Sequence, residues 1–213
     1  MLARTIANVG AGGTLKRTLE SVCVYCGSRP GSRPEYVTAA VELGRALARR
    51  KIRLVYGGAS VGLMGKVADA VLEAGGDVIG ILPRWLEDKE VGHTRLSELH
   101  IVDSMHTRKA RMIERSDAFV AMPGGMGTFD ELFEVLTWAQ VGLHEKPVGL
   151  LDVAGYFDPF RAMIRHSVVE GFAQPEHEGL FVSDADPDEL VEKLVRFERP
   201  VYGSKWVDGP KKA

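Results

Sequence analysis

The block at residues 118–140 constrains the fold of this chain more than any other part of its sequence. A strand-length apolar run, Ala118-Phe119-Val120-Ala121-Met122, leads directly into Pro123-Gly124-Gly125-Met126-Gly127-Thr128-Phe129-Asp130-Glu131. Apolar residues then recur with helical spacing at Leu132, Phe133, Val135, Leu136 and Trp138. A strand that ends in glycines and opens a helix exposes backbone N–H groups at the positive end of the helix dipole. The block therefore predicts an anion site with two carboxyl groups, Asp130 and Glu131, beside it.

Strand-like and helix-like segments alternate through the rest of the chain. We expect strands at 21–26, 53–56, 77–82, 100–102, 118–122, 147–151 and 180–182, and helices at 34–50, 62–74, 107–115, 128–140, 156–171 and 187–196. Continuously apolar strands separated by helices are typical of a parallel sheet that is covered on both faces. With right-handed crossovers, the expected fold is α/β: a single-domain, Rossmann-like, doubly wound parallel sheet that binds ligands at the carboxyl ends of its strands.

Length and charge set the domain organisation and exclude some partners. The 213 residues fit one domain, which we place at 21–198, after a flexible N-terminal extension (1–20) and before a C-terminal tail (199–213). The extension lacks the apolar core of a secretory signal, which favours a cytoplasmic protein. A net charge of -2 offers nothing to attract nucleic acid or an acidic membrane, and no apolar run approaches the roughly 20 residues of a membrane span.

The two cysteines, Cys23 and Cys26, have the spacing of a redox pair or half a metal site. They fall in a predicted strand, where positions three apart point to opposite faces. No second cysteine pair or histidine cluster completes a zinc site. We expect two structural thiols, no bound metal and a reducing compartment.

Two familiar nucleotide motifs fail when compared with the sequence. A dinucleotide fingerprint needs a third glycine where Asp130 stands. The glycine-rich run 57–66 resembles a P-loop only in part. A P-loop needs a glycine where Ser60 stands, and a Ser or Thr where Val67 stands, directly after the run. What remains is a set of small residues at several strand ends, where a ligand can lie close to the backbone. The irregular connection 83–99 is either a binding loop or an ordinary solvated connection.

Thr128 and Glu131 also have the spacing of a capping box, in which both side chains satisfy N–H groups at a helix start. Spacing alone leaves capping and catalysis open for Glu131. At a helix N-terminus its pKa should be lowered, which favours an ionised carboxylate.

A second concentration of chemistry is Met105-His106-Thr107-Arg108-Lys109-Ala110-Arg111-Met112, at the start of a predicted helix. Arg108 and Lys109 are adjacent and so lie about 100° apart around that helix, where both reach one anion only near its end. A guanidinium binds phosphate or carboxylate through a planar fork. A basic, solvated helix face is the alternative.

These motifs together resemble the LONELY GUY (LOG) family of nucleoside 5′-monophosphate phosphoribohydrolases. The resemblance rests on Pro-Gly-Gly-x-Gly-Thr-x-x-Glu at 123–131 with Met-His-x-Arg-Lys at 105–109, and it extends over roughly 21–196. It implies a Rossmann-like homodimer that needs no cofactor and cleaves the N-glycosidic bond of a purine nucleoside monophosphate, either a cytokinin nucleotide or AMP.

The resemblance also implies roles for individual residues. Arg108 and Glu131 match the catalytic pair. The nucleotide would be bound by Glu90, Arg108, Lys109, Gly124, Gly125, Met126, Gly127, Thr128, Phe129, Asp130, Glu131 and Thr137, with Glu90 in a more variable loop. Such proteins have often been labelled lysine decarboxylases, but nothing in this sequence indicates a pyridoxal-phosphate site. The competing hypothesis is a non-catalytic carrier of a nucleotide or of the molybdenum cofactor, which needs the anion site but no carboxylate at the glycosidic carbon.

Overall fold

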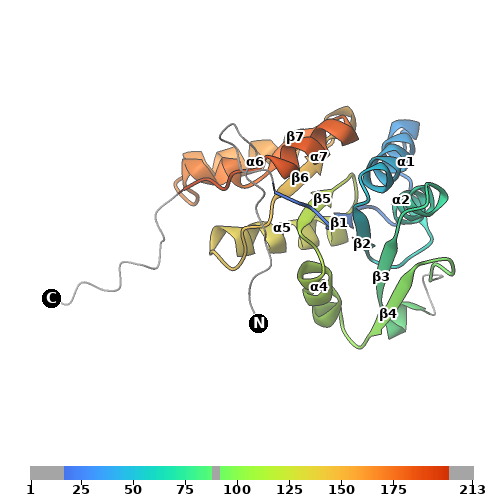
Figure 1. The fold of residues 1–213 in the computed structure, drawn as a ribbon. Helices are drawn as coiled ribbons and strands as arrows, with labels where there is room; N and C mark the ends of the chain where they lie inside the picture. The colour runs from blue at the N-terminus through green and yellow to red at the C-terminus, as the bar shows by residue number, and fades with distance from the viewer. Residues whose placement is uncertain (1–16, 88–91, 202–213) are drawn as a thin grey trace.

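The computed structural model describes residues 17–87 and 92–201, which form a parallel seven-stranded sheet between two layers of helices (Figure 1). The strands are β1 (Ser21–Tyr25), β2 (Arg53–Tyr56), β3 (Val78–Pro83), β4 (Glu98–Val102), β5 (Ala118–Ala121), β6 (Val148–Leu151) and β7 (Val182–Asp184). The helices are α1 (Pro34–Arg49), α2 (Gly62–Glu73), α3 (Arg84–Glu87), α4 (Met105–Glu114), α5 (Met126–Gln140), α6 (Asp158–Val169) and α7 (Pro187–Val195), with 3-10 turns η1 (Val153–Gly155) and η2 (Pro175–Leu180). The predicted fold class is confirmed.

Predicted and observed elements differ mainly at their ends. Helix α4 begins two residues earlier than predicted, because the side chain of Ser104 caps it by accepting a hydrogen bond from the N–H of Thr107. Strand β7 lies two residues later than predicted, because η2 occupies the preceding segment. The short helix α3 lies within the connection that we predicted to be irregular.

The order of the strands indicates where along the sheet a ligand can bind. It runs β4-β3-β2-β1-β5-β6-β7, and every paired register is parallel. The chain builds outward from β1 to β4, returns to the other side of β1 with β5, and continues to β7. Such a reversal opens a crevice between the two central strands at their carboxyl ends, where doubly wound proteins bind ligands. Here those strands are β1 and β5.

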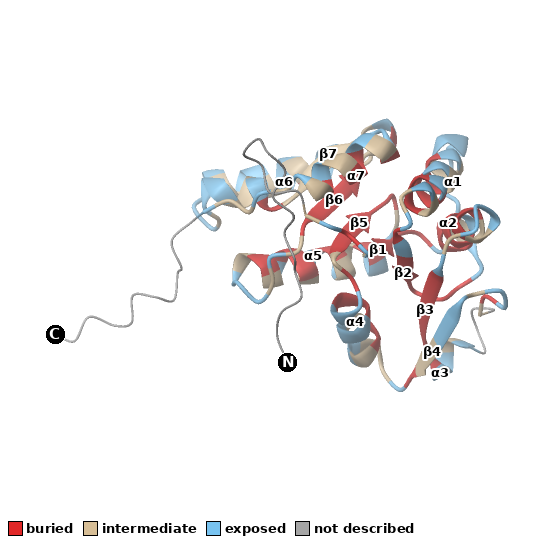
Figure 2. Cartoon of the chain, viewed as in Figure 1, coloured by how far each residue is buried: buried red, intermediate tan, exposed pale blue. Residues whose placement is uncertain are grey.

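Each face of the sheet has its own apolar core (Figure 2). One core packs the sheet against α1, α2 and α7, and the other packs it against α4, α5 and α6. Cys23 belongs to the second core and Cys26 to the first, and both thiols are buried and free. The prediction that the two thiols point to opposite faces of the sheet is confirmed.

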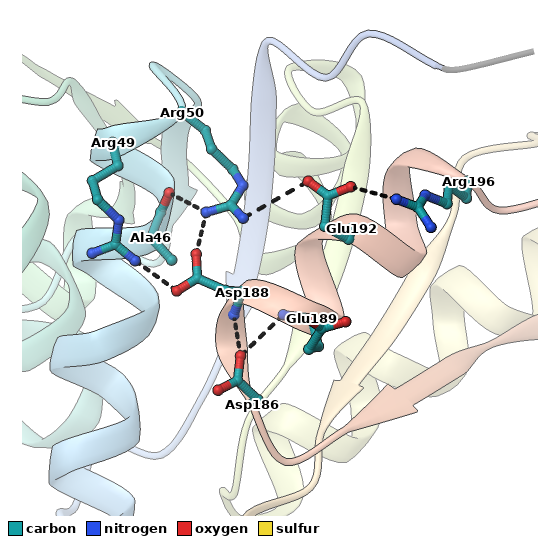
Figure 3. Close-up of polar contacts among 8 residues, drawn as sticks. All are labelled: Ala46, Arg49, Arg50, Asp186, Asp188, Glu189, Glu192 and Arg196. Atoms are coloured by element: carbon teal, nitrogen blue, oxygen red, sulfur yellow. Dashed lines mark hydrogen bonds and ion pairs between the residues drawn. The ribbon is translucent and has the colours of Figure 1, made fainter.

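A polar cluster joins α1 to α7 on the outside of the first core (Figure 3). The carboxylate of Asp188 accepts hydrogen bonds from Arg49, at 2.7 Å, and from Arg50. Glu192, one turn further along α7, lies 3.8 Å from Arg50 and 3.3 Å from Arg196. These contacts connect the first helix of the described residues to the last.

No helix in the described ranges is both long and apolar enough to cross a membrane.

Candidate functional site

The turn between β5 and α5 is held in place from three sides. The N–H of Gly27, after β1, donates to the carbonyl oxygen of Pro123 at 3.0 Å. The side chain of Thr128 packs so closely that a Cβ added to Gly124 would lie 2.1 Å from its Oγ1. The hydroxyl of Tyr156 donates a hydrogen bond to the carbonyl oxygen of Gly124. Glycine is therefore required at 124 for packing.

Packing inside the protein does not explain why the next two glycines of this turn, Gly125 and Gly127, are glycines. A Cβ added to Gly125 or to Gly127 would meet no described atom within 4 Å beyond its chain neighbours, and neither residue has a positive φ. Both positions face open space at the first turn of α5, where backbone N–H groups lack helical acceptors. Small residues at this point leave room for a ligand to approach those N–H groups closely.

The capping-box interpretation of Thr128 and Glu131 is wrong. Helix α5 begins at Met126, its N-cap is Gly125, and no side chain makes a cap hydrogen bond. Thr128 is instead the third residue of the helix and is buried against the glycine turn. Glu131 is the sixth residue, one turn beyond the position that a capping box requires, so its carboxyl group is not used for capping.

Arg108 lies beneath the same edge of the sheet, buried to 7% exposure. Its Nε donates to the carbonyl oxygen of Ile81 at 3.1 Å, and one terminal nitrogen donates to the carbonyl oxygen of Gly57 at 3.2 Å. A Cβ at Gly57 would lie 2.0 Å from that nitrogen, so the glycine makes room for the guanidinium. These bonds, from the ends of β2 and β3, fix its orientation.

The carboxyl group of Glu131 lies near that guanidinium, and its pKa is shifted. Burial raises the pKa of Glu131 to about 7, against the charge of Arg108, which lowers it. The prediction of a lowered pKa is wrong: the dipole effect fades beyond the first helical turn, whereas withdrawal from water disfavours the charged form. A carboxyl group that titrates near neutrality can take up or release a proton during a reaction.

Lys109 turns away from Arg108 and toward α5. Its ammonium group lies 3.0 Å from Asp130 and 3.3 Å from Glu134. Burial alone would lower the pKa of Lys109, but hydrogen bonds to Asp130 and Glu134 raise it, so the group stays charged at neutral pH. This cluster joins the start of α4 to the start of α5 and brings a cation to the rim of the site.

The second glycine-rich turn, between β2 and α2, is shaped by packing. A Cβ at Gly62 would lie 2.2 Å from the backbone of Ser28, and a Cβ at Gly65 would lie 2.0 Å from the carbonyl oxygen of Ser60. The N–H of His93 donates to the carbonyl oxygen of Gly58 at 3.0 Å, which ties the connection after α3 to this turn. The turn therefore supports the site by holding the end of β2 in place.

The remaining candidate residues are placed differently. Met126 is exposed, and Phe129 is half-buried and stacks on Tyr156. Thr137 lies nine residues beyond Thr128, about 14 Å along the helix, where it borders a cavity of about 210 Å³ between α5, α6 and η2. The structure does not bring Thr137 to the glycine turn of its own chain, and its contact with a nucleotide stays a prediction. Glu90 lies outside the described residues.

Sequence reasoning missed Tyr156. This residue follows η1, directly after the carboxyl end of β6, and its hydroxyl reaches the turn after β5. The sequence did contain one signal for Tyr156, its position shortly after a predicted parallel strand. Residues that follow the carboxyl ends of parallel strands lie at the ligand-binding edge of the sheet. Its contact with Gly124 depends on how the two connections pack.

Comparisons with known proteins agree with this architecture. A molybdenum cofactor binding protein of Rippkaea orientalis superposes with a TM-score of 0.60 at 22% sequence identity, over 81% of this chain and 93% of that one, which shows a shared fold. A family model described as "Possible lysine decarboxylase" matches residues 64–194.

Much higher similarity links the chain to named plant proteins. It is 53% identical to "Probable cytokinin riboside 5′-monophosphate phosphoribohydrolase LOGL9" of Oryza sativa subsp. japonica, over 87% of this chain and 82% of the relative. It is 48% identical to "Cytokinin riboside 5′-monophosphate phosphoribohydrolase LOG5" of Arabidopsis thaliana, over 86% of this chain and 81% of the relative. With identity at this level across most of both lengths, the chain belongs to the LOG family of cytokinin riboside 5′-monophosphate phosphoribohydrolases.

Proposed function

We propose that this protein hydrolyses the N-glycosidic bond of adenosine 5′-monophosphate or its N6-modified forms, releasing ribose 5-phosphate together with adenine or a free cytokinin, respectively. The proposal is supported by the oriented guanidinium of Arg108, whose charge acts on the carboxyl group of Glu131, and by the open glycine turn at the start of the helix that carries Glu131. The names of relatives at about half identity support the same reaction.

The proposed chemistry follows from the charges in the site. As the bond between C1′ and the purine nitrogen breaks, the bonding electrons leave with the base and positive charge develops on the sugar. A Glu131 carboxylate stabilises that charge and accepts a proton from the water that attacks C1′. Arg108 orients the ribosyl or base portion and stabilises the departing base, which takes up a proton from solvent. Glu131 then returns to solvent the proton that it accepted from water, so one water is consumed overall.

The glycine turn supplies binding energy at a distance from the bond that breaks. The N–H groups at the start of α5 would hold the 5′-phosphate, and the Lys109 ammonium offsets the negative charge of Asp130 beside them. Binding energy from a remote phosphate can be used to orient the reacting sugar and so lower the barrier.

Replacing Glu131 by glutamine tests the proposal directly. Glu131→Gln keeps the shape of the side chain but cannot accept the proton, so base release from AMP should fall at least about a thousandfold while AMP still binds. Base release is measured by chromatography without added metal or cofactor, and binding by calorimetry. Glu73→Gln, an exposed charge change at the end of α2, is the matched control. Near-normal turnover by Glu131→Gln would refute the assignment.

The preference for a prenylated base rests on the names of the relatives. Three side chains that could line an apolar channel are in different environments: Met64 is buried beside Gly57, whereas Trp85 and Met126 are exposed. We expect kcat/KM for isopentenyl-adenosine monophosphate to exceed that for AMP. Equal values would indicate an AMP nucleosidase.

The carrier hypothesis is separated from hydrolysis by the same assay. The molybdenum cofactor binding protein shares the fold with this chain at 22% identity. A carrier would bind its ligand and release no base from AMP or from isopentenyl-adenosine monophosphate, whereas a hydrolase releases base from at least one of them in proportion to time and enzyme.

The homodimer and the cytoplasmic location remain proposals. Support for a dimer comes from exposed apolar side chains beside the cavity that Thr137 borders, among them Phe133 and Phe172. Light scattering should give a mass in solution of twice the chain mass, and Phe172→Asp should reduce the measured mass to that of a single chain. Free buried thiols are compatible with a reducing compartment, and cell fractionation tests the location.

A further inference from the structure

The peptide unit between Gly124 and Gly125 sits at the centre of the glycine turn. Its carbonyl oxygen, on Gly124, accepts the hydrogen bond from the hydroxyl of Tyr156. Peptide bonds in the described residues are trans, so the carbonyl oxygen and the following N–H point in opposite directions. A carbonyl oxygen held on Tyr156 therefore turns the Gly125 N–H to the opposite side of the peptide plane.

The space beside Gly125 is open. A Cβ built on Gly125 would meet no described atom within 4 Å beyond its chain neighbours, and the described residues offer the Gly125 N–H no hydrogen-bond acceptor. The first-turn N–H groups of α5 begin at the next residue. The Gly125 N–H therefore extends the row of free donors at the helix start by one.

A peptide between two glycines needs such a constraint. Glycine populates positive and negative φ about equally, so this peptide can flip at little steric cost. In the flipped state the carbonyl oxygen of Gly124 would face the open side and repel an anion. Thr128 fixes the position of the Gly124 backbone. Among the described residues, only the hydroxyl of Tyr156 donates a hydrogen bond to the Gly124 carbonyl oxygen and so acts directly on its orientation.

Tyr156 is itself held rigidly. Its ring stacks on Phe129 with 6.4 Å between centroids, and it meets Tyr36 edge-on at 5.9 Å. It follows Ala154 and Gly155, which have φ values of 55° and 70°. A non-glycine residue at positive φ is uncommon and strained, so the connection adopts a costly shape that delivers this ring to the turn.

We propose that Tyr156 is a positioning residue for the substrate phosphate: its hydroxyl fixes the Gly124–Gly125 peptide so that the Gly125 N–H donates to the 5′-phosphate. This inference rests on the proposed function and adds to it a residue that does not touch the reacting atoms. The hydrogen bond also polarises the peptide, which strengthens its N–H as a donor.

Tyr156→Phe tests the proposal because it keeps the ring contacts and removes only the hydroxyl. The Kd for ribose 5-phosphate, measured by calorimetry, should rise about tenfold, the loss of one oriented hydrogen bond to an anion. The Kd for adenine, which lacks the phosphate, should stay unchanged, and the urea midpoint of unfolding should fall only slightly, through the loss of one hydrogen bond. Tyr36→Phe is the matched control, since its ring contacts Tyr156 and its hydroxyl makes no hydrogen bond among the described residues.

The outcomes separate this inference from the proposed function. If wild type releases adenine from AMP and Tyr156→Phe binds ribose 5-phosphate as tightly as wild type, the positioning role is wrong and the hydrolase assignment stands. Equal losses of affinity for ribose 5-phosphate and adenine, or a urea midpoint lowered by much more than the loss of one hydrogen bond explains, would indicate a general structural role and also refute it. If wild type neither releases adenine nor binds ribose 5-phosphate, both proposals fail.

Discussion

At the scale of single residues, the site depends on a buried, hydrogen-bonded guanidinium and on a carboxyl group whose charged form is disfavoured by burial. Arg108 is buried and donates hydrogen bonds to two backbone carbonyl groups. Burial raises the pKa of Glu131 to about 7, from an ordinary value of 4.5. Perturbed groups of this kind gather at functional sites, where preorganised charge costs stability and lowers a barrier.

The pH dependence of activity should follow Glu131. The carboxylate is the form that accepts a proton, so kcat/KM for AMP should rise with pH and level off above about 7. Initial rates between pH 5 and 9 measure this profile. A plateau that extends unchanged down to pH 5 would mean that another group accepts the proton.

The stability of the fold should change with pH in the opposite direction. Because the pKa of Glu131 is higher in the folded state, its contribution is fully present below about 4.5 and is lost as pH rises through about 7. Glu131→Gln stays neutral throughout, so its stability relative to wild type should increase from pH 5 to pH 8. Urea unfolding at both pH values tests the sign, and Glu73→Gln should show no such trend.

Arg108→Lys should impair both activity and folding although the charge is kept. An ammonium group cannot reproduce the planar fork that reaches the carbonyl oxygens of Gly57 and Ile81. We expect kcat/KM to fall by more than about tenfold and the free energy of unfolding to fall by about 1–2 kcal/mol. Arg111→Lys, on the exposed part of the same helix, should change neither quantity.

At the scale of elements, the glycines at the start of α5 have two different roles. One is needed for packing inside the protein, and two leave space in which a ligand can approach the backbone. Gly124 is required by the contact with Thr128, whereas Gly125 and Gly127 face open space. A sequence motif presents these positions as equivalent. The structure shows that they meet different demands.

Alanine substitutions should separate the two kinds of glycine. Gly127→Ala should leave the free energy of unfolding unchanged or raise it by up to about 1 kcal/mol, because alanine favours helix. It should also weaken ribose 5-phosphate binding, because the new methyl group occupies the open face. Gly124→Ala should instead lower the stability by about 1–3 kcal/mol through overpacking. Urea unfolding measures the stability of both variants, and calorimetry measures their binding of ribose 5-phosphate. Binding by Gly127→Ala as tight as that of wild type would contradict the assigned phosphate position.

At the scale of the whole molecule, the cluster between α1 and α7 contributes to stability apart from the site (Figure 3). Burial would raise the pKa of Asp188, but hydrogen bonds from Arg50 and Arg49 outweigh it and lower the pKa. The stability from this group is therefore present at neutral pH and is lost as pH falls through the lowered pKa.

Asp188→Asn should lower the free energy of unfolding at pH 7 by about 1 kcal/mol, the upper range for exposed ion pairs. The difference from wild type should shrink in high salt, because salt screens exposed charges. Adenine release by folded protein should stay the same, because none of the clustered residues lies in the site. Urea unfolding at low and high salt measures the first effect; a salt-independent difference would point to lost packing or capping.

The sequence by itself determined the parallel α/β fold, the strand that ends in glycines and the family motifs, because apolar periodicity and glycine placement are local properties of the chain. It did not determine the pKa of Glu131, since burial depends on the residues packed around the carboxyl group. The capping-box prediction failed for a related reason: spacing fits a helix start at Thr128, but tertiary packing begins the helix at Met126. Only the tertiary structure brought Tyr156 to Gly124, because the two residues are 32 positions apart and meet at the edge of the sheet.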